Sequence, residues 1–357
     1  MHKISETSGP KIFLKRLTDT GIDISDIELL NPDLNSIRSR QSSKKILIGR
    51  LDGTSYYDFS IKNLQNFLIL REYPVISKML CKLPNLKSNI ITNKIINKYL
   101  DRTCSWLLKN ADGLIFQSDI SLQMHKRFLN FDEMEKPFCI IHNGVDINKF
   151  HPKLYVEQKF GFPSVVISAS KFRLHKRLQE GIKLINHLSI YYPNIKLNIL
   201  GEMDLLTNEC VKLMDISRCV FHGKVDPTQL PFYYQNAHIQ LHLSIFDPCP
   251  NVVVEGLASG LPVITPLESG AKELIGEINL DCAVEESLKL QYMELHRYET
   301  IPIINLNEYS IVFKNIFENL RTYQKSARFR AEDALNINTI ASQYKEFFIK
   351  IRKKLND

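Results

Sequence analysis

Five short apolar runs recur from Ser164 onward, and amphipathic segments of helical length separate them. The runs are residues 165–168, 196–200, 219–222, 239–243 and 262–265, and the segments between them are 176–190, 205–215, 228–236 and 251–259. Strands that alternate with helices of about 10–15 residues form βαβ units and a parallel sheet. The pattern therefore predicts a Rossmann-like domain whose functional crevice lies at the carboxyl ends of the strands.

The first half of the chain shows the same alternation less regularly. Residues 45–50, 113–117 and 138–142 are expected strands, and residues 11–20 and 90–109 are expected helices. Pro and Gly residues punctuate the chain between Asp146 and Phe162. A length of 357 residues fits about two domains. We therefore expect an α/β protein with domains at 1–150 and 151–332, and residues 333–357 are expected to be largely helical by their apolar spacing.

Composition excludes several classes of protein. With 44% hydrophobic and 24% charged residues, the chain is neither disordered nor collagen-like. The first residues carry no apolar signal core, and no uncharged apolar run reaches the ~18 residues that a bilayer requires. The seven cysteines form no CxxC pair, so a zinc knuckle or thioredoxin motif is excluded and free thiols are expected. These features predict a cytoplasmic protein.

Positive charge is concentrated in the first half. Residues 1–150 hold 22 Lys and Arg against 16 Asp and Glu, and residues 60–130 hold 11 against 4. The excess indicates an anionic partner, unless it is simply a solvated basic surface. Apolar stretches with Lys and Arg at 67–80 and 90–108 can lie on anionic lipid, or pack a core. A nucleic-acid partner is not expected, because Trp is single and no reader motif occurs.

Residues 246–262 are the segment that is most informative about function. The segment follows an expected strand, turns through two prolines, opens a helix near Asn251 and closes it at Gly260. Free N–H groups at 251–253 would cradle phosphate oxygens, and Glu255 lies one turn on, where it could accept hydrogen bonds from a ribose. Asp247 sits in the turn, within reach of a sugar hydroxyl. The alternative, that these side chains only cap a turn and face solvent, fits the spacing equally well.

A second candidate cluster, residues 168–177, follows the first strand of the same half. Five of the seven residues from Lys171 to Arg177 are cationic or His. Two or three such cations would balance a diphosphate without a metal ion. The alternative is an exposed basic helix start, but cations there oppose the helix dipole at roughly 0.3–1 kcal/mol each. We therefore favour an anion site.

Three motifs together resemble a known family. Residues 142–146 read His-Asn-Gly-Val-Asp, the basic turn ends in Lys176, and Asp247 and Glu255 form an acid-x7-acid segment followed by Gly-Leu-Pro-Val-Ile at 260–264. In order and separation they are similar to a family 4 glycosyltransferase of the GT-B fold from about residue 110 to 276. The Asp-Pro-Cys-Pro-Asn sequence at 247–251 resembles a bacterial and viral subgroup of that family.

That resemblance implies a GT-B enzyme with two Rossmann-like domains facing across a cleft, the first binding the acceptor and the second the donor. The implied reaction is a retaining transfer of a hexosyl or related sugar from a nucleotide-sugar donor to a hydroxyl of a glycan or lipid-linked acceptor. A lipid-linked acceptor would suit peripheral contact of the basic first domain with the inner face of a membrane. In this fold a C-terminal helix, here within 333–357, packs back across the first domain.

Site residues carry over by motif match. Glu255 is similar to the carboxylate that holds the donor ribose, and Lys176, with Arg173 or Lys171, resembles the basic pair that holds the diphosphate and stabilises the leaving group. Asp247 takes the place of the acid near the transferred sugar, so the implied catalytic residues are Asp247, Lys176 and Arg173. The implied donor-binding set is Gly9, Lys171, Arg173, Lys176, Pro250, Asn251, Val252 and Glu255, where Gly9 belongs to a first loop that faces the phosphates.

Some positions depart from the family pattern. The first acid is Asp where Glu is usual, and Ser170-Lys171 replaces the usual Gly-Arg. The His of the family's first domain has no equivalent, and Arg50 or Asp52 is expected to act on the acceptor side instead. No Asp-x-Asp triplet occurs, so we expect no metal ion and no cofactor beyond the nucleotide-sugar.

Two alternatives stay open at this point. The Asp at position 247 leaves room for a catalytically silent module that only binds a nucleotide-sugar. A GT-B nucleotide-sugar epimerase is the other alternative, although the 247–255 segment argues against it.

Overall fold

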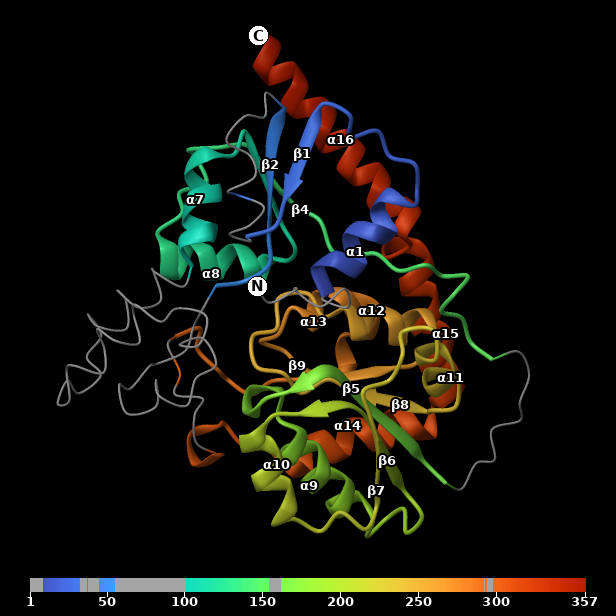
Figure 1. Cartoon of the computed structure of the whole chain (residues 1–357). Helices are drawn as coiled ribbons and strands as arrows, with labels where there is room; N and C mark the ends of the chain where they lie inside the picture. The colour runs from blue at the N-terminus through green and yellow to red at the C-terminus, as the bar shows by residue number, and fades with distance from the viewer. Residues whose placement is uncertain are drawn as a thin grey trace, which may run out of the picture.

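Two α/β units, one stacked on the other, make up the protein (Figure 1). The computed structural model describes residues 9–32, 37, 45–54, 101–153, 162–291, 293 and 298–357. The basic stretch at 67–80 and most of the expected helix at 90–109 lie outside these residues. None of the described helices combines the length and the apolar character that crossing a bilayer requires.

The first domain is a three-layer unit around a parallel sheet. Its strands lie in the order β1 (Ile27–Leu30), β2 (Ile46–Leu51), β3 (Gly113–Phe116) and β4 (Phe138–Ile140). Side chains alternate between the two faces, as the pleat of a strand requires: Ile48 and Ile115 join one core cluster, and Leu47 and Leu114 another. The helices of this unit are α1 (Gly9–Thr18), α7 (Arg102–Asn110), α8 (Asp119–Leu129) and α16 (Ile337–Asn356).

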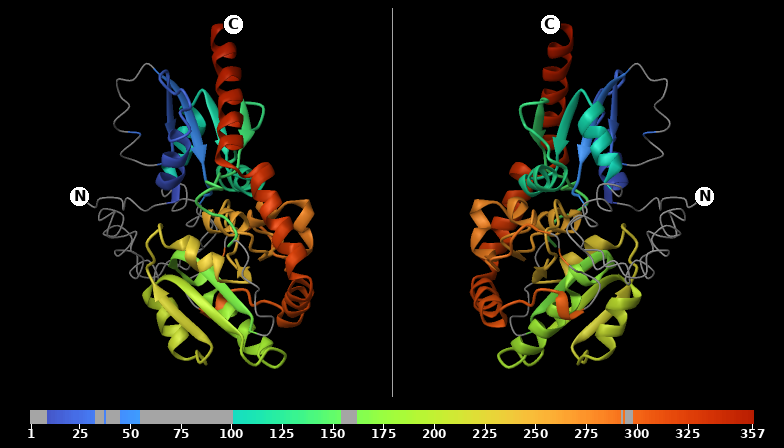
Figure 2. Two further views of the ribbon diagram at one scale, coloured as in Figure 1. Left: turned by 90° about the vertical axis from the view of Figure 1, so that its right-hand side faces the viewer. Right: turned by 90° about the vertical axis from the view of Figure 1, so that its left-hand side faces the viewer.

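Each face of that sheet has its own helices. Phe13 and Leu17 of α1 and the apolar side of α16 share the cluster that contains Ile48. Leu107 of α7 and Leu122 of α8 share the cluster that contains Leu47. The last helix of the chain therefore completes the core of the first domain, and Figure 2 shows it running along that domain.

The second domain has a six-stranded parallel sheet in the order β10-β9-β8-β5-β6-β7. The strands are β5 (Ser164–Phe172), β6 (Lys196–Met203), β7 (Cys219–Gly223), β8 (Ile239–Leu241), β9 (Val263–Pro266) and β10 (Ala283–Val284). From β5 the chain builds β6 and β7 on one side, and then returns to build β8 and β9 on the other. The order reverses between β5 and β8, and such a switch point is where doubly wound sheets bind ligands.

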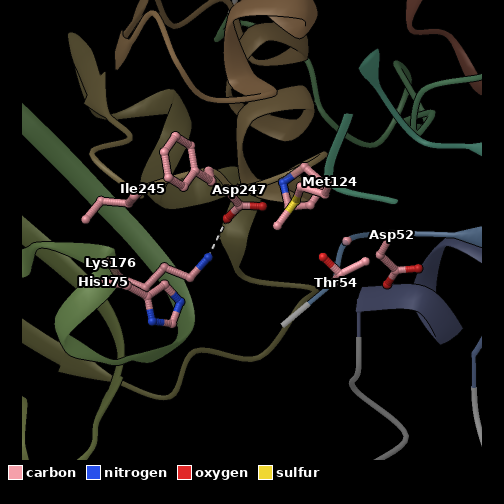
Figure 3. A pocket seen from close by; sticks show the side chains of 10 residues that line it. Asp52, Thr54, Met124, His175, Lys176, Ile245 and Asp247 are labelled. Carbon is pink, nitrogen blue, oxygen red and sulfur yellow. Dashed lines mark hydrogen bonds and ion pairs between the residues drawn. The ribbon is translucent and has the colours of Figure 1, made fainter. Parts of the chain in front are cut away.

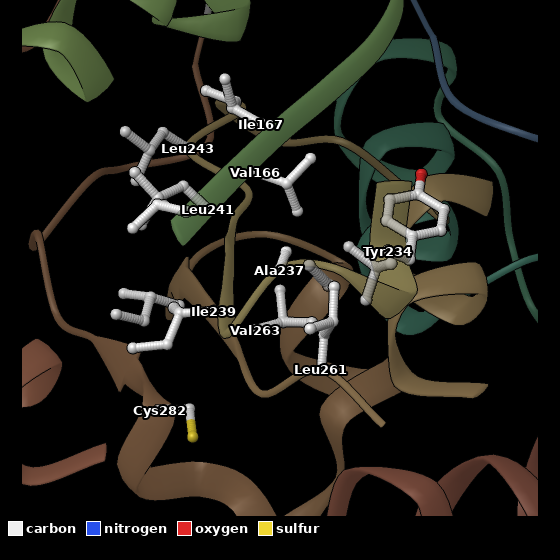
Figure 4. Close-up of a cluster of buried hydrophobic side chains, with 14 of the residues drawn as sticks. Val166, Ile167, Tyr234, Ala237, Ile239, Leu241, Leu243, Leu261, Val263 and Cys282 are labelled. Atoms are coloured by element: carbon white, nitrogen blue, oxygen red, sulfur yellow. The ribbon is translucent and has the colours of Figure 1, made fainter. Parts of the chain in front are cut away.

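Helices cover both faces of this sheet. Gly181 in α9 (Leu178–Leu188) lies against Ile167 and Leu241, whereas Gln240, the neighbour of Leu241, lies against α12 (Asn251–Ala258) and donates to the carbonyl of Val252. The side chains between strands and helices form one continuous buried core (Figure 4). The other helical segments are η1 (Leu174–Lys176), α10 (Leu205–Lys212), α11 (Leu230–Gln235), α13 (Ala271–Ile275), η2 (Glu277–Cys282), η3 (Tyr298–Thr300), α14 (Leu306–Glu318) and α15 (Leu320–Ala334).

Two chain crossings between the domains meet at one point. The N–H of Val145 donates to the carbonyl of Leu335 at 2.9 Å, and the N–H of Ile337 donates to the carbonyl of Val145 at 3.0 Å. A Cβ on Gly144 would come within 2.9 Å of the Cα of Ile337, so only glycine allows the two segments to approach this closely. The Asn-Gly of the 142–146 motif thus builds the joint between the domains.

The predicted elements are largely present. All five strands expected from Ser164 onward are found, as are the three expected in the first half. β1, β10 and α8 were not expected from the sequence. The C-terminal helix begins at Ile337 and not at Asp333, because α15 runs on to Ala334 and the Asn336 side chain caps α16 by accepting from the N–H of Asn338.

Candidate active site

A pocket of about 180 Å³ lies between the two domains (Figure 3). From the first domain it is lined by the turn after β2, at Asp52, Gly53 and Thr54, and by Met124 of α8. From the second domain it is lined by His175 and Lys176 after β5, and by residues 245–248 after β8. The second-domain side of the pocket therefore comes from the two loops at the switch point of the sheet.

Lys176 and Asp247 meet in this pocket. The Lys176 ammonium donates a hydrogen bond to Oδ2 of Asp247, and Nε2 of His242 lies 3.6 Å from the same oxygen. Burial works to raise the pKa of the Asp247 carboxyl, but Lys176 and His242 outweigh it and hold that pKa below its usual value. Asp247 is therefore ionised at neutral pH, with a cation beside it.

Two buried histidines stay neutral beside this pair. Burial, together with the positive charge of nearby Lys176, lowers the pKa of His242 to about 4 and that of His175 to about 3. His238 and His242 lie on either side of β8 and have different partners. His238 accepts a hydrogen bond from the N–H of Ser164 at 3.0 Å, whereas Nε2 of His242 has no hydrogen bond to any described residue and faces Asp247. His242 directly follows β8, where a side chain reaches the crevice.

The basic side chains of residues 171–177 do not gather at one site. Arg177 is fully buried, has a left-handed φ of 52°, and pairs with the Glu286 carboxylate at 2.7 and 3.0 Å. Arg173 is exposed, and Lys171 is half-buried at the end of β5. Of the basic side chains expected to hold a diphosphate, Lys176 lines the pocket, whereas Lys171 and Arg173 are not among its lining residues.

The helix expected at Asn251 begins at that residue. Pro250 is its N-cap, and the N–H of Val253 donates to the Pro250 carbonyl at 3.0 Å. The N–H of Val252 lies in the first turn, where the helix offers no acceptor. The loop that carries Asp247 is held by Gly270, whose N–H donates to the Asp247 carbonyl at 2.8 Å, and where a Cβ would collide with the Pro248 carbonyl.

Glu255 is buried in the first turns of this helix, with 4% of its surface exposed. Burial raises the pKa of its carboxyl, and the Arg16 guanidinium opposes that rise. Nη2 of Arg16 donates to Oε1 of Glu255 at 2.5 Å, so a first-domain side chain holds the acid expected to bind the ribose. No motif in the sequence signalled Arg16, which lies in α1 seven residues after Gly9, the first residue of that helix.

The two acceptor-side candidates have different positions. Arg50 is 1% exposed, and its guanidinium donates to Tyr344, Asn31 and Asn143 and lies over the Phe13 ring, so it supports the domain from within. Asp52 lines the pocket. Burial raises the pKa of its carboxyl, as does the negative charge of Asp247, and within the described residues its Oδ1 has no hydrogen-bond partner.

Further contacts tie the domains together around the pocket. Nδ2 of Asn143 donates to the carbonyl of Cys249 at 2.8 Å. The Glu273 carboxylate of α13 accepts from the N–H groups of Asp119 and Ile120 at 2.7 and 3.2 Å, so it caps α8 of the first domain. A carboxylate at a helix N-terminus is favourable because the free N–H groups and the helix dipole both attract negative charge. Neither contact was anticipated.

A metal site is not evident in the described part of the chain. Among those residues no group of three or more His, Cys, Asp or Glu side chains is placed to hold a metal ion. The expectation that cationic side chains balance the diphosphate therefore stays a prediction.

Comparison with known sequences finds similarity to glycosyltransferases over part of the chain. Residues 156–282 match the family model described as "Glycosyl transferases group 1". A glycogen synthase of Mycobacterium tuberculosis is 25% identical over 185 residues, which are 50% of this chain and 44% of that protein. An uncharacterized glycosyltransferase of Methanocaldococcus jannaschii is 25% identical over 157 residues, 41% of this chain and 40% of that protein. The matches thus span less than half the length of these curated relatives.

Solved structures resemble the whole chain. A sucrose-phosphate synthase from Thermosynechococcus elongatus has a TM-score of 0.58 at 16% identity and covers 97% of this chain and 78% of its own. Anabaena HepE, solved in complex with UDP and glucose, has a TM-score of 0.56 at 16% identity and covers 95% of this chain and 81% of its own. The chain therefore has the GT-B fold, two Rossmann-like domains facing across a pocket, and its residues 156–282 match the group 1 glycosyl transferases.

Proposed function

We propose that the protein transfers a sugar from a nucleotide-sugar donor to an acceptor hydroxyl, with retention at the anomeric carbon and without a metal ion. The observation that carries this proposal is the pairing of Lys176 and Asp247 at the switch point of the second sheet, in a pocket whose other wall belongs to the first domain. The match of residues 156–282 to glycosyl transferases supports the same reaction class.

Each polar group has a role in this proposal. The nucleoside lies against α12, with its ribose hydroxyls donating to Glu255 and a phosphate oxygen at the N–H groups of Asn251 and Val252 next to Pro250. Lys176 faces the diphosphate as its bond to the sugar breaks and negative charge develops there. Arg173 or Lys171 supplies the second cation, and Gly9 leaves room near the phosphates.

The acceptor enters from the first-domain side of the pocket. Asp52 accepts a hydrogen bond from its hydroxyl, and Asp247 binds a hydroxyl of the transferred sugar. The acceptor oxygen bonds to the anomeric carbon while the nucleoside diphosphate leaves with the electron pair of the broken bond, and the proton of the acceptor hydroxyl passes to the departing phosphate oxygen. A glycan or a lipid-linked sugar would present such a hydroxyl, and the basic first domain would suit an acceptor at a membrane surface.

Donor turnover tests the proposal. The protein is incubated with UDP-, GDP- and ADP-sugars, and nucleotide release is measured with and without an acceptor mixture and in the presence of EDTA. We expect release from one nucleotide class, unaffected by EDTA, and a product whose anomeric configuration by NMR equals that of the donor. Nucleotide binding without turnover would instead indicate a silent binding module, and conversion of the free donor sugar would indicate an epimerase.

A further inference from the structure

We propose that Arg16 of the first domain is a positioning residue for the donor: it holds the Glu255 carboxylate in the orientation that receives the ribose. This inference rests on the proposed function. Glu255 belongs to the second domain and Arg16 to the first, so the ribose site of one domain is completed by the other.

Contacts of the Arg16 guanidinium fix its position. Nη2 donates a hydrogen bond to Oε1 of Glu255 at 2.5 Å, and Nη1 donates one to the carbonyl of Gly144 at 3.3 Å. The guanidinium carbon lies 5.7 Å from the centre of the Phe150 ring. Three separate segments therefore hold Arg16, and two of them, Gly144 and Phe150, flank the crossing from one domain to the other.

This geometry leaves one carboxylate oxygen available. The ion pair engages Oε1, and no hydrogen bond to Oε2 is found in the described part of the chain. A carboxylate that binds a ribose needs an oxygen free to accept from a hydroxyl. Arg16 thus fixes the Glu255 carboxylate through Oε1 and leaves Oε2 available to the ribose.

Arg16 also helps to keep the Glu255 carboxylate ionised. Burial raises the pKa of Glu255, and the positive charges of Arg16 on α1 and of Lys149 next to Phe150 lower it. The Tyr234 hydroxyl on α11, whose pKa the Glu255 charge raises, is a neutral group in the same surroundings. Without Arg16 the carboxyl would stay protonated to higher pH. A protonated Glu255 is a weaker acceptor, so donor binding would then be lost at a pH where the unchanged protein still binds.

Titration of nucleotide binding with pH tests this role. The nucleoside diphosphate that binds best among UDP, GDP and ADP is titrated by calorimetry from pH 5.5 to 8.5 against the unchanged chain, Arg16→Ala, Arg16→Lys and Lys15→Ala. Lys15 is the exposed neighbour of Arg16 on the same helix and controls for the loss of one charge. For Arg16→Ala we expect the acid limit of binding to move up by about one pH unit, which is about tenfold weaker binding on that limb. Arg16→Lys should restore most of the shift.

Three results would overturn the inference. One is an Arg16→Ala profile that lies parallel to that of the unchanged protein, because a structural loss weakens binding equally at every pH. Another is tighter binding by Arg16→Ala, which would make Arg16 a competitor of the ribose. The third is a Lys15→Ala shift as large as that of Arg16→Ala. If none of the three nucleotides binds the unchanged protein, the proposed function itself fails, and thermal melts of each variant separate both cases from misfolding.

Discussion

Lys176 and Asp247 form an ion pair between the loops that follow β5 and β8, although 71 residues separate them in sequence. The parallel sheet places these two strands side by side, and their carboxyl ends open on the first domain. A donor diphosphate that reaches Lys176 finds this cation already oriented by Asp247, so little reorganisation is needed when charge develops on the leaving group.

Replacing Lys176 by alanine should lower the turnover of the donor by about 100-fold or more, because the developing negative charge loses its oriented cation. Nucleotide release by the variant, measured at saturating donor, is compared with that of Lys212→Ala, which removes an exposed lysine at the end of α10. Equal rates for Lys176→Ala and the unchanged protein would contradict the assignment of Lys176.

Exchanging Glu255 for glutamine removes the charge but keeps the size of the side chain. Donor use, taken as kcat/KM from initial rates, should fall by about 100-fold, because the ribose loses its ionic acceptor and Arg16 is left unpaired. Glu209→Gln, on the exposed side of α10, is the matched control. A kcat/KM that changes no more than that of the control would remove Glu255 from the donor site.

Acidification should destabilise the protein through its buried neutral imidazoles. Burial lowers the pKa of His125 from 6.5 to about 4, so below about pH 6.5 the unfolded chain binds a proton that the native protein does not. The free energy of unfolding therefore falls as the pH drops from about 6.5 to about 4, by roughly 3 kcal/mol for this group alone. His242 and His175 act in the same direction.

Urea unfolding at pH 5 and pH 7 measures that effect. His125→Gln should reduce the stability difference between the two pH values, since one titrating group is gone, and His151→Gln removes an imidazole from an exposed position as the comparison. His125 lies in α8 against the Phe116 ring and, unlike its neighbour Met124, is not among the residues that line the pocket, so donor binding at pH 7 is a separate readout. An unchanged pH slope in His125→Gln would refute the effect of His125.

Glu273 should hold the domains in their closed arrangement. Glu273→Ala removes the carboxylate that caps α8 from the other domain, which is worth about 1–2 kcal/mol in a partly buried setting. We expect a larger radius of gyration by small-angle X-ray scattering and a lower kcat with little change in nucleotide affinity. Glu277→Ala, a nearby exposed acid, is the control. Identical scattering curves for Glu273→Ala and the control would show that the cap does not maintain closure.

Sequence periodicity was enough to predict the second sheet, because its buried parallel strands are short β-branched runs with helices between them. It also located Lys176 and Asp247, since both follow such strands directly. Periodicity could not predict the contact between Arg16 and Glu255, because 239 residues separate the pair and the contact depends on how the two domains dock. For the same reason the sequence did not reveal that Arg177 turns inward to Glu286 while Lys176, its neighbour, faces the pocket.

The paired crossings at Val145 and Leu335 determine how the two halves of this molecule can separate. The two connecting segments are hydrogen-bonded to each other at this point, so a displacement of one pulls on the other. We expect the lobes to move relative to each other mainly by rotation about this joint, where Gly144 and Ile337 are in close contact. Such a rotation would part Asp52 from Asp247 while Arg16, whose guanidinium lies at the joint itself, 3.3 Å from the Gly144 carbonyl, stays close to Glu255, so the acceptor side of the pocket would open before the ribose site is disturbed.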